Sequence, residues 1–221
     1  EHLEVLERRA QGLLHLINQF YEFSALLCGE EPMELRRTDL GRMCREQLLG
    51  SFARLEEAWI EVSVQIPDRP VWIMADENAL SRILGNLLQN AVRYGKTHLA
   101  IEIQENRISD RESRVILVFA NDTEHLYAET VERIFDRFYT GSQARNQGGT
   151  GLGLAISRRL AEQMGGGMTV EARETKTAAG VERAPGERRG AAVQGNAGQE
   201  AGMRLAFKTE FRGGPFEGQG I

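Results

Sequence analysis

The chain has 221 residues, of which 41% are hydrophobic and 27% charged, which is enough apolar material for one domain of ordinary size and an appendage. Its net charge of −5 and pI near 5.6 argue against nucleic acid as the main partner. The two cysteines, Cys28 and Cys44, lie in predicted helices and suggest free thiols in a reducing compartment. No apolar run approaches the roughly 20 residues that span a bilayer, and the start, EHLEVLERR, does not have the pattern of a signal peptide.

The first 28 residues are predicted to form one long amphipathic helix. Its apolar stripe alternates in steps of four and three, as the a and d positions of a heptad do. Such a stripe is typical of a helix that packs against partner helices in a bundle, and a helix packed on its own domain is the alternative. The stripe consists of Leu6, Ala10, Leu13, Ile17, Phe20, Ser24 and Leu27.

Helices and strands are predicted to alternate after this helix. Thr38 or Asp39 can cap a helix that runs to about residue 59, and Asp76 can cap another that runs to Tyr94. Strands are expected near 61–66, 71–75, 99–104 and 115–120, the last two forming a hairpin. A short helix near 128–135, a helix that follows the glycine turn from about Leu154 and closing strands at 168–171 and 203–211 complete the order. Residues 175–202 are poor in large apolar side chains and are expected to be a mobile insertion in a hairpin.

Four glycines within residues 148–153 stand directly before the last of these helices. Such a turn leaves backbone N–H groups uncovered, and the helix dipole adds partial positive charge, so the motif favours anion binding. No Lys-Ser/Thr pair follows, which excludes a P-loop, and the position in the chain excludes a dinucleotide-binding turn. A glycine-rich surface turn is the alternative.

The helix from Asp76 to Tyr94 carries two asparagines off its apolar face. Asn86 and Asn90 are four residues apart, so they lie one above the other, and Arg93 follows one turn later. Asparagine is a mediocre helix former, so the pair either belongs to an ordinary solvated face or presents amide oxygens to a hard cation.

Three segments together resemble the ATP-binding domain of sensor histidine kinases of two-component systems. Residues 86–91 (NLLQNA), 135–139 (FDRFY) and 149–154 (GTGLGL) resemble the N box, the F box and the second glycine box of that family, in the family's order and spacing. The resemblance implies an α+β fold, the two-layer α/β sandwich of the Bergerat (GHKL) superfamily, with a mixed sheet and helices on one face. It also implies three regions: 1–31, the second helix of a dimerisation and phosphotransfer hairpin; 32–212, the catalytic domain with the insertion 175–202; and 213–221, a tail.

The resemblance assigns a role to each matching residue. Asn90 is expected to coordinate the Mg²⁺ that bridges the triphosphate, and Asn86 and Arg93 to complete the catalytic set near the phosphates. Tyr94 is expected to lie against the adenine or ribose. The glycine box is expected to hold phosphate oxygens, and the F box to form the base of a mobile lid over 139–148, with Arg137 pairing either with phosphate or within the protein. The glycine-box residues are Gly149, Thr150, Gly151, Leu152, Gly153 and Leu154, and the F-box residues are Phe135, Arg137 and Phe138.

The adenine-binding segment departs from the family pattern. Where the family has Asp-x-Gly-x-Gly, this chain has NDTEH at 121–125, so Asn121 replaces the adenine-binding Asp and Thr123 replaces a glycine. An amide oxygen still accepts a hydrogen bond from adenine, but without charge. Asp122 is the rival, and the alternation of side chains along a strand favours Asn121.

The expected reaction is transfer of the γ-phosphate of ATP to a histidine. An amide at Asn86 cannot take a proton, whereas the gyrase-like ATPases have a water-activating Glu there, so hydrolysis is disfavoured. None of the four histidines, His2, His15, His98 and His125, has the family's acceptor context, so the acceptor helix is expected upstream and outside this chain.

The resemblance further implies ATP and Mg²⁺ as ligands, a response regulator as partner and a homodimer formed through the N-terminal helix. A cytoplasmic location is expected, with membrane attachment only through absent upstream segments. The alternatives are a serine kinase of the same fold that regulates a sigma factor, and a module that binds nucleotide or dimerises without catalysis.

Overall fold

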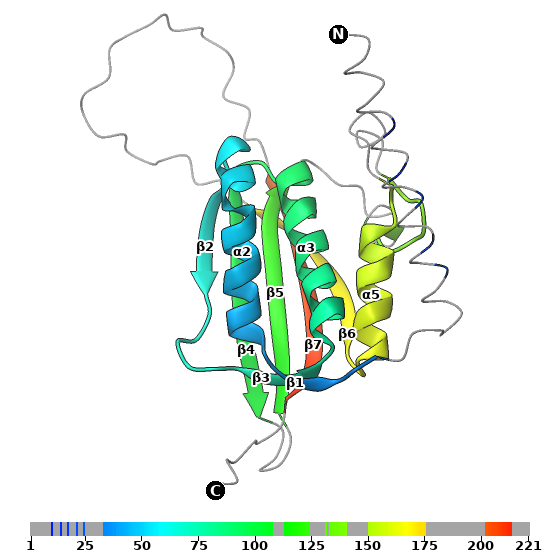
Figure 1. Cartoon of the computed structure of the whole chain (residues 1–221). Helices are drawn as coiled ribbons and strands as arrows, with labels where there is room; N and C mark the ends of the chain where they lie inside the picture. Colours follow the sequence, from blue (N-terminus) through cyan, green and yellow to red (C-terminus); the bar gives the residue numbers. More distant parts are fainter. Residues whose placement is uncertain are drawn as a thin grey trace, which may run out of the picture.

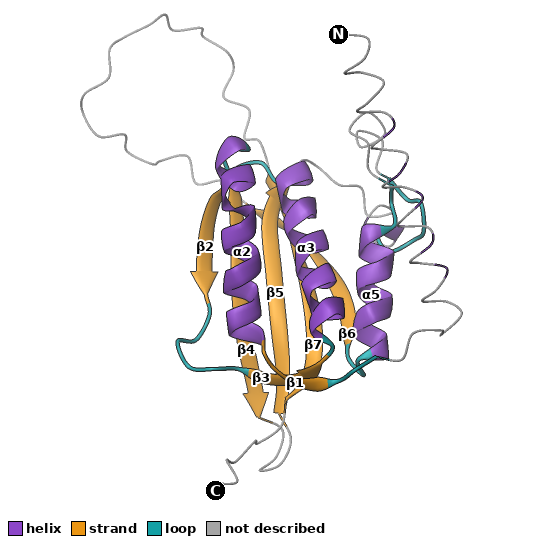
Figure 2. Cartoon of the chain, viewed as in Figure 1, coloured by secondary structure: helices purple, strands orange, loops and turns teal. Residues whose placement is uncertain are grey.

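A computed structural model describes residues 33–107, 113–123, 133–140, 150–175 and 202–213, and single helical positions at 10, 14, 17, 21, 24 and 131. The described part is a two-layer sandwich in which three helices lie side by side over one face of a seven-stranded sheet (Figures 1 and 2). The helices are α2 (Leu40–Glu57), α3 (Glu77–Tyr94) and α5 (Gly153–Gln163). The expected α+β sandwich with helices on one face is therefore confirmed.

The strands are β1 (Arg36–Asp39), β2 (Glu61–Gln65), β3 (Trp72–Ala75), β4 (His98–Arg107), β5 (Ser113–Thr123), β6 (Gly167–Thr175) and β7 (Gly202–Gly213). Their order is β1-β3-β7-β5-β4-β2, and β6 also pairs with β7. The sheet is mixed, because β2 pairs with β4 in parallel and the other pairs are antiparallel. The last strand of the chain is thus central and connects the two halves of the sheet.

Two aspartates start the first two helices. Asp39 accepts hydrogen bonds from the N–H groups of Gly41 (3.0 Å) and Arg42 (3.3 Å), so it, and not Thr38, caps α2. Asp76 accepts from Ala79 N–H at 3.0 Å and caps α3 as expected. Thr38 instead lies in β1, a strand that the sequence did not predict.

The core lies between the helices and the sheet. The apolar face of α3 is fully buried, and every second residue of β5 from Val115 to Phe119 faces it. The apolar residues whose spacing of 3.6 and 2 predicted α3 and β5 are therefore the residues that fill the core. The core residues of α3 are Ala79, Leu80, Ile83, Leu84, Leu87, Leu88 and Ala91.

Other expectations fall largely outside the described residues. In the N-terminal helix the described positions are helical and exposed, including Ala10, Ile17 and Ser24 of the predicted stripe. The insertion lies outside the described residues apart from its ends, Thr175 and Gly202, and so does the tail apart from Gly213. The proposed boundaries of the three regions stay predictions. No helix in the described segments is both long and apolar enough to span a bilayer.

Candidate functional site

Asn86 joins the middle of α3 to the first turn of α5. Its amide nitrogen donates to the carbonyl oxygen of Gly153 and to the hydroxyl of Ser157, both at 3.0 Å. Ser157 is fully buried and donates its own proton to Gly153 O at 2.9 Å. The predicted asparagine motif and the predicted glycine motif, 67 residues apart in sequence, therefore meet at hydrogen-bond distance.

The last turns of α3 extend past the start of α5 (Figure 1). Asn90 lies one turn beyond Asn86, about 6 Å further along the helix axis. Its side chain is half-buried and makes no hydrogen bond within the described part of the chain. Arg93 and Tyr94 follow on the final turn and are also half-buried. Asn90 thus lies on the part of α3 beyond the contact of Asn86 with Gly153.

The start of α5 has no side-chain cap from its N-cap residue in the part of the chain that the structure describes. Leu152, at the N-cap position, makes no capping hydrogen bond through its side chain and is itself buried in the core. Thr150 accepts a bond from Leu152 N–H at 3.3 Å, and Leu154 is half-buried on the first turn. A helix N-terminus without a side-chain cap keeps its donors available for an anion.

Gly151 sits in a conformation that only glycine adopts easily. Its φ is +67°, and a Cβ there would lie 2.6 Å from the carbonyl carbon of Phe138. Phe138 itself has a φ of +59° and donates its N–H to Gly151 O at 3.0 Å. The F box and the glycine box, the two ends of the predicted lid segment, are therefore in backbone contact.

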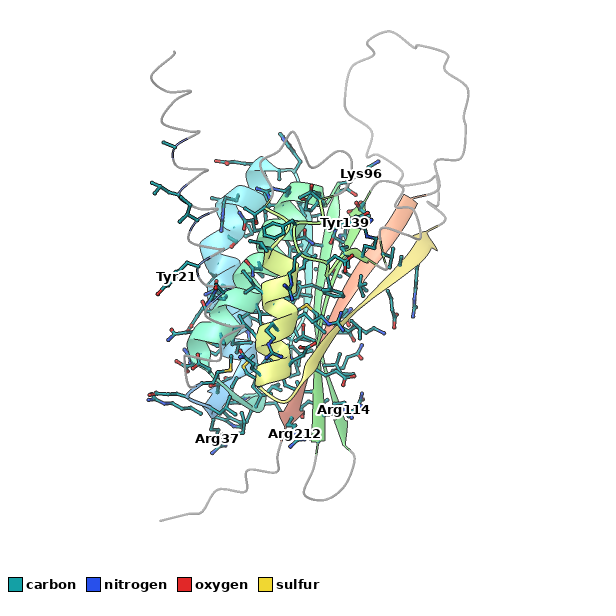
Figure 3. All side chains as sticks on the ribbon, turned by 90° about the vertical axis from the view of Figure 1, so that its right-hand side faces the viewer. Tyr21, Arg37, Lys96, Arg114, Tyr139 and Arg212 are labelled. Atoms are coloured by element: carbon teal, nitrogen blue, oxygen red, sulfur yellow. The ribbon has the colours of Figure 1, made fainter. Side chains whose placement is uncertain are left out.

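Aromatic and cationic side chains surround this contact. Phe135 is half-buried against the core, with the guanidinium of Arg158 5.3 Å from its ring centre. Arg133 lies 4.7 Å from the ring centre of Tyr139 and forms an ion pair with Asp136 at 3.1 Å. Tyr139 lies at the same end of the molecule as Lys96, which follows α3 (Figure 3). Arg137 is exposed, and neither of its two predicted roles is tested.

The end of β5 supplies the remaining predicted residues. Asn121 and Thr123 continue the stripe of β5 that faces α3, and Asn121 is only 4% exposed. The Asn121 amide nitrogen donates to Asp122 O at 3.1 Å, so its oxygen is the group left to accept a bond. Asn121 therefore lies on the face of β5 that the alternation of side chains predicted for it.

The side chain of Asp122 lies on the opposite face of β5 from Asn121 and forms hydrogen bonds with the segment after α3. Its carboxylate accepts from Thr97 N–H (3.1 Å), His98 N–H (2.7 Å) and the Thr97 hydroxyl. Burial by itself would raise the pKa of Asp122, but these donors outweigh it and hold the pKa below its usual value. The carboxylate that rivals Asn121 is therefore engaged in a structural role.

Of the predicted site residues, only Gly149 lies outside the described part of the chain. Three contributors were missed: Ser157, Arg158 and Arg133. Ser157 follows Gly153 by one helical turn, so its proximity was readable from the sequence, whereas its bond to Asn86 was not. Within the described residues no group of three or more His, Cys, Asp or Glu side chains gathers as a metal site.

The two-layer sandwich, with an asparagine of one helix bonded to the start of another, agrees with a known class of ATPase. A family model described as histidine kinase-, DNA gyrase B- and HSP90-like ATPase matches residues 75–194. The chain belongs to this family. Within it the chain is a histidine kinase-type ATP-binding domain, because its relatives include many sensor histidine kinases.

Two curated relatives illustrate the similarity. Sensor histidine kinase YcbM of Bacillus subtilis is 29% identical over 76% of this chain and 54% of its own length. Sensor histidine kinase AruS of Pseudomonas aeruginosa is 32% identical over 78% of this chain and 18% of its own length. The chain thus spans about half or less of the curated relatives that it matches.

Solved structures show the same fold. Full-length ShkA in complex with AMPPNP superposes with a TM-score of 0.67 at 24% identity, covering 94% of this chain and 37% of that one. The catalytic domain of histidine kinase ThkA superposes with a TM-score of 0.56 at 22% identity, covering 81% of this chain and 98% of that one. At these identities the likeness supports the fold alone.

Proposed function

We propose that this domain binds Mg²⁺–ATP and transfers the γ-phosphate to a histidine on a helix outside this chain, for relay to an aspartate of a response regulator. The observation that carries the proposal is the contact of Asn86 with Gly153 and Ser157, because it places the asparagine face of α3 at the uncovered start of α5. The complex of ShkA with AMPPNP, a relative in fold, supports a nucleotide as the ligand.

The residues present fit both ligands. Amide oxygens of Asn90 and Asn86 are the hard ligands that Mg²⁺ takes, and they leave room for water and phosphate oxygens in its shell. The backbone N–H groups of Gly151, Gly153 and Leu154 suit phosphate oxygens, and Gly151 has no space for a side chain on its Phe138 side. Bound Mg²⁺ supplies charge neutralisation at the phosphates, and the protein supplies positioning.

Adenine is proposed to bind where β5 ends. The Asn121 oxygen accepts from the adenine amine, while Tyr94 lies against the base or ribose and Thr123 lines the same side. Because the amide carries no charge, this hydrogen bond is weaker than one to a carboxylate. Arg93 completes the phosphate end, and Phe135, Arg137 and Phe138 form the lid base.

The same proposal includes the protein's partners and setting. A homodimer through the N-terminal helix brings an acceptor helix to the site, and the domain works on the cytoplasmic side. Exposure of the apolar Leu14 and Ile17, at 61% and 54%, supports a partner for that helix.

The test supplies a histidine-bearing acceptor helix in trans together with labelled ATP and Mg²⁺. We expect label on the histidine, and we expect Asn90→Ala to lower transfer at least 100-fold because the cation loses a ligand. Asn78→Ala is the matched control, because Asn78 is exposed on the same helix. Label on a protein serine would favour the serine kinase, binding without transfer would favour a non-catalytic module, and the absence of Mg²⁺-dependent nucleotide affinity would overturn the proposal.

A further inference from the structure

Ser157 is a buried hydroxyl whose single proton is already used. It occupies the second turn of α5 with no exposed surface and donates to the carbonyl oxygen of Gly153, four residues earlier, at 2.9 Å. A hydroxyl has one proton and two lone pairs, so towards any further neighbour Ser157 acts only as an acceptor. The neighbour is the side-chain amide of Asn86, at 3.0 Å.

Two acceptors therefore fix which way the Asn86 amide faces. Gly153 O, a carbonyl, and Ser157 Oγ, with its proton committed, both require an N–H group from Asn86. Both bonds come from the amide nitrogen, so the N–H side of Asn86 faces the start of α5. The flipped amide would place its oxygen against two acceptors and lose both bonds.

The Asn86 oxygen is then the atom of the side chain that faces away from these two acceptors. It forms no hydrogen bond in the described part of the chain and is not sealed in the interior. A Cβ added to Gly153 would lie 3.5 Å from it, so the oxygen stands beside the first residue of α5. The nitrogen is turned towards Gly153 and Ser157, whereas the oxygen on the other side of the amide suits a cation or a water bound to that cation.

We infer that Ser157 is a positioning residue that holds the Asn86 amide with its oxygen towards the cation of the bound nucleotide. The inference that this oxygen serves the cation rests on the proposed function; the orientation of the amide does not. Ser157 itself lies under the helix start and contacts no ligand.

The first measurement tests the orientation of the Asn86 side-chain amide in the absence of nucleotide. In an NMR spectrum of the full 221-residue chain, the side-chain amide pair that disappears in Asn86→Asp identifies Asn86. We expect both of its protons to exchange slowly with water in the wild type, compared with those of exposed Asn78, and at least tenfold faster in Ser157→Ala. Exchange as fast as that of Asn78 in the wild type would overturn the inference.

The second measurement tests whether this orientation strengthens the Mg²⁺-dependent binding of nucleotide. Titration with AMPPNP, with Mg²⁺ and with EDTA, gives the affinity gained from the metal. We expect Ser157→Ala to lower that gain about fivefold, the value of one neutral hydrogen bond, while affinity in EDTA stays unchanged. Ser157→Thr keeps the hydroxyl and should restore the gain. Ser51→Ala, which removes a buried serine hydroxyl from α2, is the matched control.

The outcomes separate the two proposals. An equal loss with and without Mg²⁺ in Ser157→Ala, or a Thr variant no better than the Ala variant, means that Ser157 acts only on the fold and overturns the positioning role. A wild type without Mg²⁺-dependent affinity overturns the proposed function and with it the cation role, while the exchange measurement still decides the orientation of Asn86. If Ser157→Ala does not fold, Ser157→Cys, of similar size but a weak hydrogen-bonding group, takes its place.

Discussion

Two glycines in one motif do different things in this protein. Gly151 adopts a left-handed backbone against Phe138, where a Cβ would overlap backbone atoms at 2.6 Å. Gly153 begins α5 with an ordinary helical backbone, and a Cβ there would meet only the Asn86 side chain at 3.5 Å. Sequence shows both as glycines in a box, but the first requires glycine for its backbone conformation and its space, whereas a Cβ at the second would make only an ordinary contact.

Alanine at each position should separate these needs. Gly151→Ala is expected to lower the free energy of unfolding by about 3 kcal/mol, because strain and overlap add. Gly153→Ala is expected to stay within about 1 kcal/mol of wild type, since alanine favours helices and its Cβ would make only an ordinary contact with Asn86. Urea unfolding checks the pair, and equal destabilisation by both substitutions would contradict the distinction.

At the level of elements, one strand serves two purposes through its two faces. The α3-facing residues of β5 pass from core to site at Asn121, and the neighbouring Asp122 ties the α3–β4 connection to the sheet. Because successive side chains of a strand point to opposite faces, Asn121 and Asp122 act on different sides of β5. The end of α3 is therefore held by the same strand end that is proposed to bind the base.

The bonds of Asp122 make stability depend on pH. Its pKa is lowered in the folded chain, so its contribution is complete above the unfolded value, about 3.9, and is lost as the pH falls through the folded value. Asp122→Asn is expected to lower the free energy of unfolding by about 1 kcal/mol at pH 7, and by progressively less as the pH falls below about 4. Urea unfolding at a series of pH values tests this, with exposed Asp68→Asn as control. A difference independent of pH would contradict it.

For the whole molecule, the late strands complete a sheet begun by the early ones. β7 pairs with β5, β6 and, through Gly213 opposite Ile73, with β3. The hairpin of β6 and β7 stays in register to its end, where Thr175 lies opposite Gly202. The segment 176–201 therefore connects two positions that the sheet already holds together.

This register predicts that the segment is dispensable for folding. Replacing residues 176–201 by Asn-Gly, which suits a two-residue hairpin turn, should keep the fold and raise the free energy of unfolding by up to about 2 kcal/mol through lower loop-closure entropy. Circular dichroism and urea unfolding measure the result. A chain that no longer folds would show that the segment packs on the domain, and replacement of 108–112 in the β4–β5 hairpin offers a comparison.

Sequence reasoning predicted most of the described elements because their signals are local. The apolar spacing of α3, the cap at Asp76 and the alternation of β5 each act within a few residues. β1 was missed because Arg36–Asp39 has no alternation of its own, and its pairing with β3 arises only in the folded chain. The glycine and asparagine motifs were found as separate patterns, since each has its own composition.

The sequence alone determined the class of domain, through three motifs that resemble a known family, and the order of most of its elements, because motifs, periodicity and caps are properties of short segments. Tertiary structure alone decided that Asn86 meets Gly153 and Ser157, that Asp122 turns away from the site, and that β7 joins both halves of the sheet. These contacts link residues 24 to 71 positions apart or join whole strands, and their geometry depends on how the helices pack on the sheet, which no local pattern encodes.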